Sequence, residues 1–373
     1  MKQVGQWMGR MIAETRIITA GVLVVAAIVA VVLLAYVGLS SALGVAYVAE
    51  SARDLVLKPR PPQLDFVDYD RRMMILALAT TTLPVQNASS SASGTTPIVE
   101  PLWPTKAVYP NAGALLPFYR VLAYYGNFYS KQMGILGEFE EDEVLRRLLE
   151  EKAKWEAADP TTPVLPAIEY IDVTAQESPG KDGKYRLRMP DDQVDKALAM
   201  AAKVSGIVIL DVQVGLSTLE DELPHLEKYW QMPNVHLALD PEFSMKKGGR
   251  PGIVIGTFDA ADINYAAGYL AKIVREHSLP PKILIVHRFT QTMVTNYQSI
   301  QPLPEVQIVM VMDGWGPTWK KQGTYDAFIA PEPVQFTGVK IFYKNDLKPP
   351  STELWTPHDV LKLTPRPIYI QYQ

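Results

Sequence analysis

Carboxylate side chains follow several short apolar runs in the second half of the chain. Asp211 lies near the end of the run 207–213, Asp240 and Glu242 come at the end of another, and Asp313 ends a third. When several carboxylates share one cleft, their repulsion raises the pKa of at least one of them, which then holds a proton near neutral pH. A protonated acid beside an ionised carboxylate is the pair that hydrolysis of a glycosidic bond requires.

Other ionisable and aromatic side chains occupy similar positions. The predicted catalytic residues are Glu169, Asp211, Asp240, Glu242, His287 and Asp313, with Lys344 as a further candidate. The predicted substrate-binding residues are Tyr124, Tyr125, Trp315 and Tyr343. Aromatic faces suit stacking against the apolar faces of sugar rings. We expect Glu242 to be the general acid, because it lies furthest along its strand. Asp211 or Asp240 is then the nucleophile or base, and Glu169 and His287 tune the pKa values of these groups.

Each of these residues also has a structural interpretation. A carboxylate at the end of a strand often caps a turn or helix, and Asp240-Pro241-Glu242 is typical of such a cap. His287 is equally well explained as a hydrogen-bonded core histidine, and Trp315 as a side chain packed on a neighbouring loop. Lys344 suits an ion pair better than a Schiff base. The prediction of a site therefore depends on the group and not on any one member.

Composition excludes several kinds of chemistry. The 373 residues include no cysteine, which excludes disulfides, thiolate metal sites and a cysteine nucleophile. The net charge of -4 and the absence of a basic stripe argue against nucleic-acid binding. The chain has no Gly-x-Ser-x-Gly, Walker or His-Glu-x-x-His motif, and Tyr124-Tyr125-Gly126 stands where a metal-dependent amidohydrolase would carry His-x-His. We therefore predict no metal and no cofactor.

The elements that position these residues alternate regularly after Phe118. Candidate strands are 121–125, 164–171, 207–213, 235–240, 282–289, 306–313, 338–344 and 368–372. Candidate helices are 141–157, 191–204, 218–229, 260–277, 291–297, 318–328 and 357–361. Strand–helix alternation predicts parallel βα units, and eight units predict a (β/α)8 TIM barrel over residues 118–373. In this fold the carboxyl ends of the strands form the catalytic face, where the ionisable residues would meet.

An uncharged segment near the N-terminus predicts one transmembrane helix. Residues 17–39 are almost wholly Val, Ala, Ile and Leu, enough to span a bilayer. Lys2, Arg10 and Arg16 precede them, which predicts a single-pass cell-membrane protein with a cytoplasmic N-terminus and an extracytoplasmic barrel. Residues 1–49 would be the cytoplasmic stub and anchor. A cleaved signal peptide, with small residues at 42–46, is the alternative.

Residues 50–117 form a predicted Pro/Ser-rich stalk. Prolines at 59, 61 and 62 break any helix that leaves the membrane, and residues 87–96 read NASSSASGTT, a flexible composition. The largely apolar run 71–83 could be a strand or a helix on the base of the barrel. Because the chain stops directly after the eighth predicted strand, we expect a stalk segment to cover the face that a last helix would occupy.

Four short motifs carry a resemblance to a known group of proteins. They are Ala123-Tyr124-Tyr125-Gly126-Asn127, Leu210-Asp211-Val212-Gln213, Leu239-Asp240-Pro241-Glu242-Phe243 and Val286-His287-Arg288-Phe289. Over residues 118–373 the chain resembles exported bacterial TIM-barrel proteins of unassigned function, which are similar in outline to glycoside hydrolases. It lacks the Asp-x-x-Asp-x-Asp-x-Glu strand of chitinase-like hydrolases.

Two functions are consistent with these observations. The first is a membrane-tethered, glycoside-hydrolase-like protein that acts on or binds a cell-envelope polysaccharide. The second is a non-catalytic barrel ectodomain that serves as a structural or accessory subunit of a membrane or cell-envelope complex. An open cleft lined by a carboxylate pair would favour the first, and carboxylates locked to arginine or lysine would favour the second.

Overall fold

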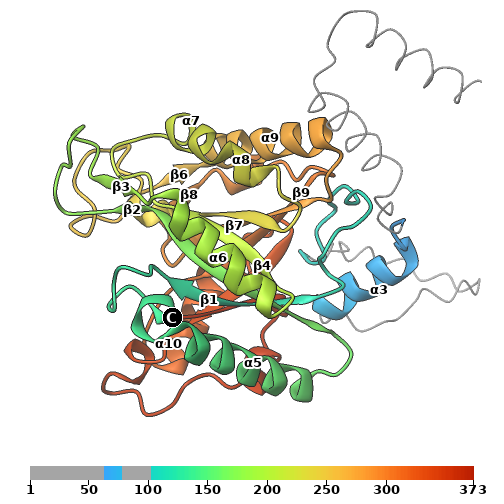
Figure 1. Ribbon diagram of the computed structural model, residues 1–373. Coiled ribbons are helices and arrows are strands. Elements are labelled where there is room, and N and C mark those ends of the chain that lie inside the picture. Colours follow the sequence, from blue (N-terminus) through green and yellow to red (C-terminus); the bar gives the residue numbers. More distant parts are fainter. Residues whose placement is uncertain (1–62, 78–101) are drawn as a thin grey trace, which may run out of the picture. The chain divides into compact units, whose positions relative to one another are not determined.

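The computed structural model describes residues 63–77 and 102–373, and its larger part is a closed barrel of eight parallel strands with helices between them (Figure 1). The barrel strands are β1 Arg120–Gly126, β2 Val164–Ala175, β4 Ile207–Val212, β5 Val235–Leu239, β7 Lys282–Arg288, β9 Val306–Met312, β10 Phe336–Ile341 and β11 Tyr369–Tyr372. They pair in this order, and β1 pairs with both β2 and β11, which closes the ring. Each predicted strand overlaps one of them, so the predicted TIM-like barrel is confirmed.

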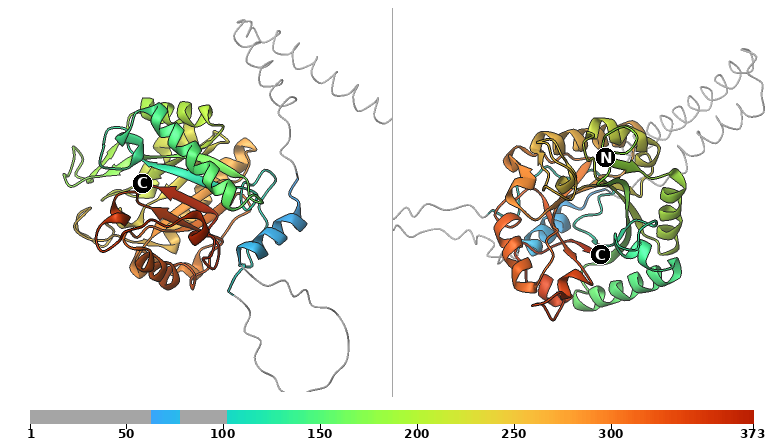
Figure 2. Two further views of the ribbon diagram at one scale, coloured as in Figure 1. Left: turned by 90° about the horizontal axis from the view of Figure 1, so that it is seen from below. Right: turned by 90° about the vertical axis from the view of Figure 1, so that its left-hand side faces the viewer.

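Helices surround the strands on the outside, as the view along the barrel shows (Figure 2). They are α4 Ile135–Glu138, α5 Glu141–Ala158, α6 Asp191–Lys203, α7 Leu219–Glu222, α8 Glu227–Trp230, α9 Ala260–His277, α10 Thr318–Phe328 and α11 Pro357–Val360. Short 3-10 turns are η1 Leu223–Leu226, η2 Pro241–Phe243, η3 Gln291–Met293, η4 Tyr297–Ser299 and η5 Asn345–Leu347. Three further short strands are β3 Arg186–Arg188, antiparallel to β2, and the pair β6 Phe258–Asp259 and β8 Val294–Thr295.

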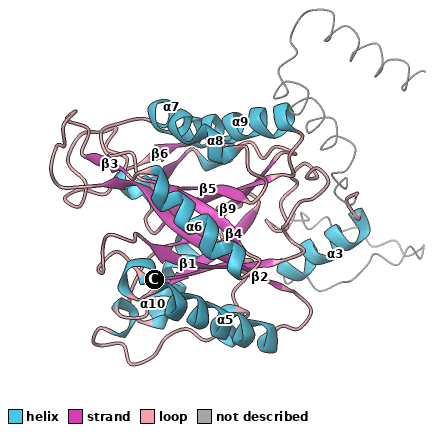
Figure 3. Ribbon diagram, in the orientation of Figure 1, coloured by secondary structure: helices cyan, strands magenta, loops and turns pink. Residues whose placement is uncertain are grey.

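Two predicted helices are wrong in detail (Figure 3). The predicted helix 218–229 is divided into α7, η1 and α8, because Pro224 inside it has no backbone N–H to continue the ladder. The predicted helix 291–297 is η3 followed by β8, which pairs with β6. Neither change moves a predicted site residue.

The core has two layers because successive side chains of a strand point to opposite faces. On β4, Val208 and Leu210 belong to the layer between strands and helices. Ile207 and Ile209 belong to the layer inside the barrel. Both faces are buried, as expected for parallel strands covered by helices. The inward face is largely apolar at the amino ends of the strands, where Gln307 and His236 are polar members, and it becomes ionisable at their carboxyl ends, which positions the site.

Part of the predicted stalk is packed against the barrel. Helix α3, Phe66–Leu76, contributes Tyr69 and Met73 to the inner core layer, together with Leu116. The backbone N–H of Arg366 donates to the carbonyl of Leu76 at 2.6 Å. This helix therefore lies at the lower end of the barrel, where the strands begin, and it overlaps the run 71–83 that the sequence left unassigned.

The outer face of the last strand is covered by helices of the barrel itself. Ile370 and Tyr372 of β11 pack in the outer layer with residues of α5 and α11, and Nε1 of Trp155 in α5 donates to the Tyr372 hydroxyl at 3.0 Å. The expectation that a stalk segment covers this face is wrong for α3, which closes the lower end instead.

The predicted transmembrane segment 17–39 lies outside the described residues. Within residues 63–77 and 102–373, none of the helices has the length and apolar character needed to cross a membrane.

Candidate functional site

The upper end of the barrel, where the strands end, gathers most of the predicted catalytic residues inside the ring. Glu169 on β2, Asp211 on β4 and His287 on β7 point inward and are fully buried, while Asp240 and Asp313 directly follow β5 and β9. This convergence follows from the parallel pairing, because strands that run in one direction present their carboxyl ends at the same end of the ring.

His287 lies between two carboxylates. Its Nε2 atom is 3.4 Å from Oε1 of Glu169, and its Nδ1 atom is 3.3 Å from Oδ2 of Asp313. Burial alone would lower the pKa of this imidazole, but the charges of Asp313 and Glu169 outweigh burial and raise the pKa to about 9. In this arrangement His287 is a buried cation at neutral pH.

Lys340 is a second buried cation, and it is not among the residues predicted for the site. Its Nζ atom lies 3.2 Å from Oδ1 of Asp313 and 3.9 Å from the centre of the Tyr125 ring. Burial opposes the charge, but the surrounding carboxylates, Asp313 first, raise the pKa of Lys340 above its ordinary value. The sequence signal for Lys340 was its position two residues after Gly338, which places both on one face of the predicted strand 338–344.

Lys344, the lysine that the sequence analysis selected, does not belong to this group. It is exposed, and its Nζ atom lies 2.6 Å from Oε1 of Glu138. The ion-pair interpretation of Lys344 is therefore confirmed.

Glu169 and Asp211 each have one oxygen held from a strand that is not adjacent to their own in the ring. Oε2 of Glu169 accepts from the Tyr369 hydroxyl and, at 2.6 Å, from Nε2 of Gln371. Oδ2 of Asp211 accepts from the Tyr125 hydroxyl at 2.9 Å, while its Oδ1 atom is buried without a partner. Burial raises the pKa of Asp211 to about 7.

The Asp240-Pro241-Glu242 segment is a capping turn that also presents a carboxyl group. Oδ1 of Asp240 accepts from the backbone N–H of Glu242 at 3.1 Å, at the start of η2, so the capping interpretation is confirmed. Burial raises the pKa of Asp240 well above its ordinary value. Burial, and then the charge of Asp313, raises the pKa of Glu242 to about 7. Both groups therefore retain protons more strongly than exposed carboxyl groups do.

A cavity of about 420 Å³ opens above this group. Its ionisable lining residues are Tyr125, Asp240, Glu242, Asp313, Lys320 and Lys340. Its aromatic lining residues, Tyr125 apart, are Phe243, Phe289, Trp315 and Phe342. Glu169, Asp211 and His287 do not line it. The predicted catalytic residues thus divide into three carboxyl groups at the cavity and three groups buried below its floor.

The four predicted substrate-binding aromatic residues are also divided. Tyr125 and Trp315 line the cavity, and Trp315 is 48% exposed. Tyr124 points to the opposite face of β1 from Tyr125, and its hydroxyl lies 3.1 Å from the Tyr343 hydroxyl in the outer core layer. Alternation along the strand explains why only one member of the Tyr124-Tyr125 pair reaches the interior.

A scan against protein-family models and a search of curated proteins find no match to the sequence. What the site can do therefore follows from its groups. Glu242 has a carboxyl group that can carry a proton near neutral pH, and Asp313 has a carboxylate held by two cations, Lys340 and His287. Both line one cavity, and this arrangement can donate a proton and stabilise positive charge or attack a carbon centre.

Proposed function

We propose that this protein is a glycoside-hydrolase-like barrel whose cavity binds and cleaves a cell-envelope polysaccharide. The observation that carries the proposal is that Glu242 and Asp313 line one cavity and that Asp313 is paired there with two cationic side chains. The pKa of Glu242 is raised to about 7 by burial and by the Asp313 charge. Asp313 lies 3.2 Å from Lys340 and 3.3 Å from His287. Glycosidic hydrolysis uses such a pair, one acid that holds its proton and one carboxylate that stays ionised.

In this proposal Glu242 is the general acid, and Asp313 is the nucleophile or the base that activates water. Asp211 does not fit the second role, since it is fully buried and does not line the cavity. Asp240 does not fit it either, because burial raises its pKa well above the ordinary value and so disfavours the ionised form that this role needs. The role that the sequence suggested for Asp211 or Asp240 therefore passes to Asp313.

The remaining parts of the proposal concern substrate and location. Trp315, half exposed at the cavity rim, offers a face for a sugar ring, although Nζ of Lys320 already lies 5.3 Å from its ring centre. The uncharged segment 17–39, preceded by basic residues, would hold the protein in the membrane with the barrel outside. A polysaccharide of the cell envelope would then be within reach.

The test compares the rates at which the unsubstituted and Glu242→Gln full-length proteins cleave a panel of soluble and envelope polysaccharides. Cleavage is measured as the release of reducing ends. Removing a general acid is expected to lower the rate by about 10²–10⁴-fold. Glu276→Gln is the matched control, because Glu276 is an exposed residue of α9 far along the helix from the cavity loops. It should turn over substrate as the unsubstituted protein does.

The second function, a non-catalytic ectodomain in a membrane or envelope complex, is favoured by one observation. Lys340–Asp313 and His287–Glu169 are buried pairs of the kind that hold a structure together. If the unsubstituted protein releases no reducing ends, or if Glu242→Gln melts several degrees lower at neutral pH, Glu242 is a structural group and this second function is the better one.

A further inference from the structure

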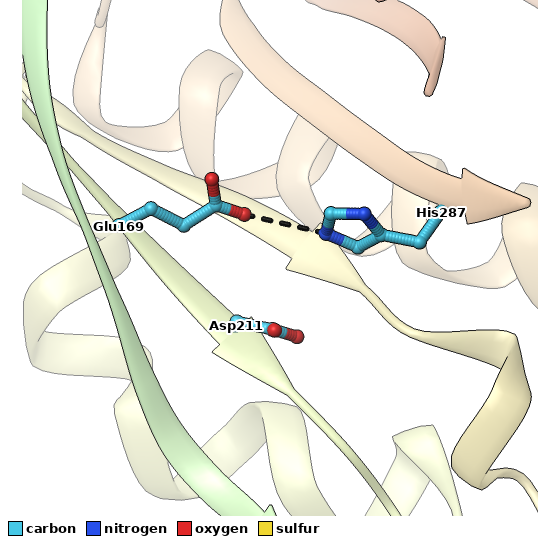
Figure 4. A group of neighbouring side chains, drawn as sticks. All are labelled: Glu169, Asp211 and His287. Atoms are coloured by element: carbon cyan, nitrogen blue, oxygen red, sulfur yellow. Dashed lines mark hydrogen bonds and ion pairs between the residues drawn. The ribbon is translucent and has the colours of Figure 1, made fainter. Parts of the chain in front are cut away.

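We propose that Glu169, Asp211 and His287 bind one divalent transition-metal ion below the floor of the cavity. Figure 4 shows the three side chains approaching one another from β2, β4 and β7. Each offers one ligand atom, and these three atoms lie within 4.8 Å of one another. All three residues are fully buried, so an ion held there would exchange slowly with solvent.

The two carboxylates differ in their second oxygen. The Tyr369 hydroxyl and Nε2 of Gln371 donate to Oε2 of Glu169, and its Oε1 atom is bonded to Nε2 of His287 at 3.4 Å, a contact that a bound ion would replace. The Tyr125 hydroxyl donates to Oδ2 of Asp211, and Oδ1 of Asp211 has no partner although it is fully buried. A buried acceptor without a donor is costly, and a cation would satisfy it.

Each ring nitrogen of His287 has a carboxylate oxygen within 3.4 Å, although Nδ1 makes no hydrogen bond, and an ion at Nε2 would displace the proton that this nitrogen otherwise holds. The Nε2 atom faces Glu169, and the Nδ1 atom lies 3.3 Å from Oδ2 of Asp313. In metal sites the second ring nitrogen commonly contacts a carboxylate, which orients the ring and increases its basicity. Asp313 would serve this purpose for His287 while Lys340 balances its charge.

Distance and charge indicate the class of ion. Ligands bound at about 2.1 Å with tetrahedral angles lie about 3.4 Å apart, and the Nε2–Oε1 distance between His287 and Glu169 is 3.4 Å. A bound ion would keep Asp211 ionised, and the two carboxylates would then balance the charge of a dication. One imidazole with two carboxylates suits Zn²⁺, Mn²⁺ or Fe²⁺ better than Mg²⁺ or Ca²⁺, which prefer oxygen ligands alone.

Zn²⁺ binding to the full-length, chelator-treated protein tests the proposal, with Mg²⁺ in parallel. We expect one Zn²⁺ per chain by elemental analysis and calorimetry, weaker Mg²⁺ binding, and a higher melting temperature with Zn²⁺. Asp211→Asn and His287→Gln should each lose stoichiometric binding. Tyr125→Phe, which keeps all three ligands but removes an outer hydrogen bond, should weaken binding by about 10–100-fold.

Asp172→Asn is the matched control. Asp172 is also a buried carboxylate of β2 with an unpartnered Oδ1 atom, but its charged neighbours are Asp191, Glu222 and Arg188. The proposal is overturned if the unsubstituted protein binds no Zn²⁺, or if His287→Gln binds it as Asp172→Asn does. If Asp211→Asn fails to fold, these two measurements still decide. None of them uses a polysaccharide, so failure of the proposed hydrolysis would leave their outcome unchanged.

Discussion

The two ends of the barrel interior treat buried polar groups differently. At the lower end, Gln307 of β9 is fully bonded, since its Oε1 atom accepts from the backbone N–H groups of Leu115 and Leu116 and its Nε2 atom donates to the Leu116 carbonyl. At the upper end, Oδ1 of Asp211 and Oε1 of Gln371 are buried without partners. The lower end thus bonds the Gln307 amide to the backbone, although Nε2 of His236 there is also without a partner, whereas the upper end gathers several ionisable groups, among them one carboxylate with an unpartnered oxygen.

Two histidines show the same difference through their charge. His236, on the inward face of β5 near the lower end, has its pKa lowered well below the ordinary value, by burial first and then by the Lys282 charge. It stays neutral, and its Nδ1 atom accepts from the backbone N–H of Ile283 at 2.9 Å. His287 is equally buried, but the charges of Asp313 and Glu169 raise its pKa to about 9. Because both histidines are fully buried, the neighbouring carboxylates decide which of the two is charged.

Substitution of Lys340 should have the largest effect on stability. Lys340→Met leaves Asp313 with one of its two cations missing, and breaking a buried pair costs about 3–5 kcal/mol of unfolding free energy. The loss should be largest near pH 8 and smaller near pH 5, where the buried carboxyl groups hold protons. Urea unfolding at both pH values measures it. Lys344→Met, which breaks only an exposed pair, should cost about 0–1 kcal/mol, and equal losses for the two variants would show that burial adds nothing to the Lys340–Asp313 pair.

A substitution at the lower end should have a smaller effect that does not depend on pH. Gln307→Leu leaves the N–H groups of Leu115 and Leu116 and the Leu116 carbonyl without their partner, at a cost of about 1–3 kcal/mol. Urea unfolding between pH 5 and 8 should give the same difference in unfolding free energy between Gln307→Leu and the unsubstituted protein at every pH. A loss that grows with pH would show that the lower end is coupled to the charged groups above it.

The smallest expected effect is the change in the melting temperature with pH when Glu242 is replaced. The folded-state pKa of Glu242, about 7, is above its ordinary value of 4.5, so the folded state holds this proton more tightly. The stabilisation is complete below about pH 4.5 and is lost as the pH rises through 7. Glu242→Gln should therefore melt as the unsubstituted protein does at pH 4.5 and about 1–4 °C higher at pH 8. If the two melting temperatures differ by the same amount from pH 4.5 to pH 8, the pKa of Glu242 is not raised in the folded state.

The sequence by itself determined the barrel and the end of it that carries the chemistry. Each strand alternates between two faces, and a pattern such as Ile207-x-Ile209-x-Asp211 shows where the inward face becomes polar. Eight such strands separated by helical stretches leave little choice of fold. Alternation is a property of neighbouring residues in the chain, and for this reason it can be read without a structure.

Only the tertiary structure decided which residues meet. Glu169, Asp211 and His287 come from three strands with no ligand spacing in the sequence, so the metal site that we propose had no linear signal. Lys340 rather than Lys344 enters the barrel because the strand ends at Ile341, a boundary that the pattern alone does not fix. Closure of the ring and its register set these distances, and both result from packing across strands that are far apart in the chain.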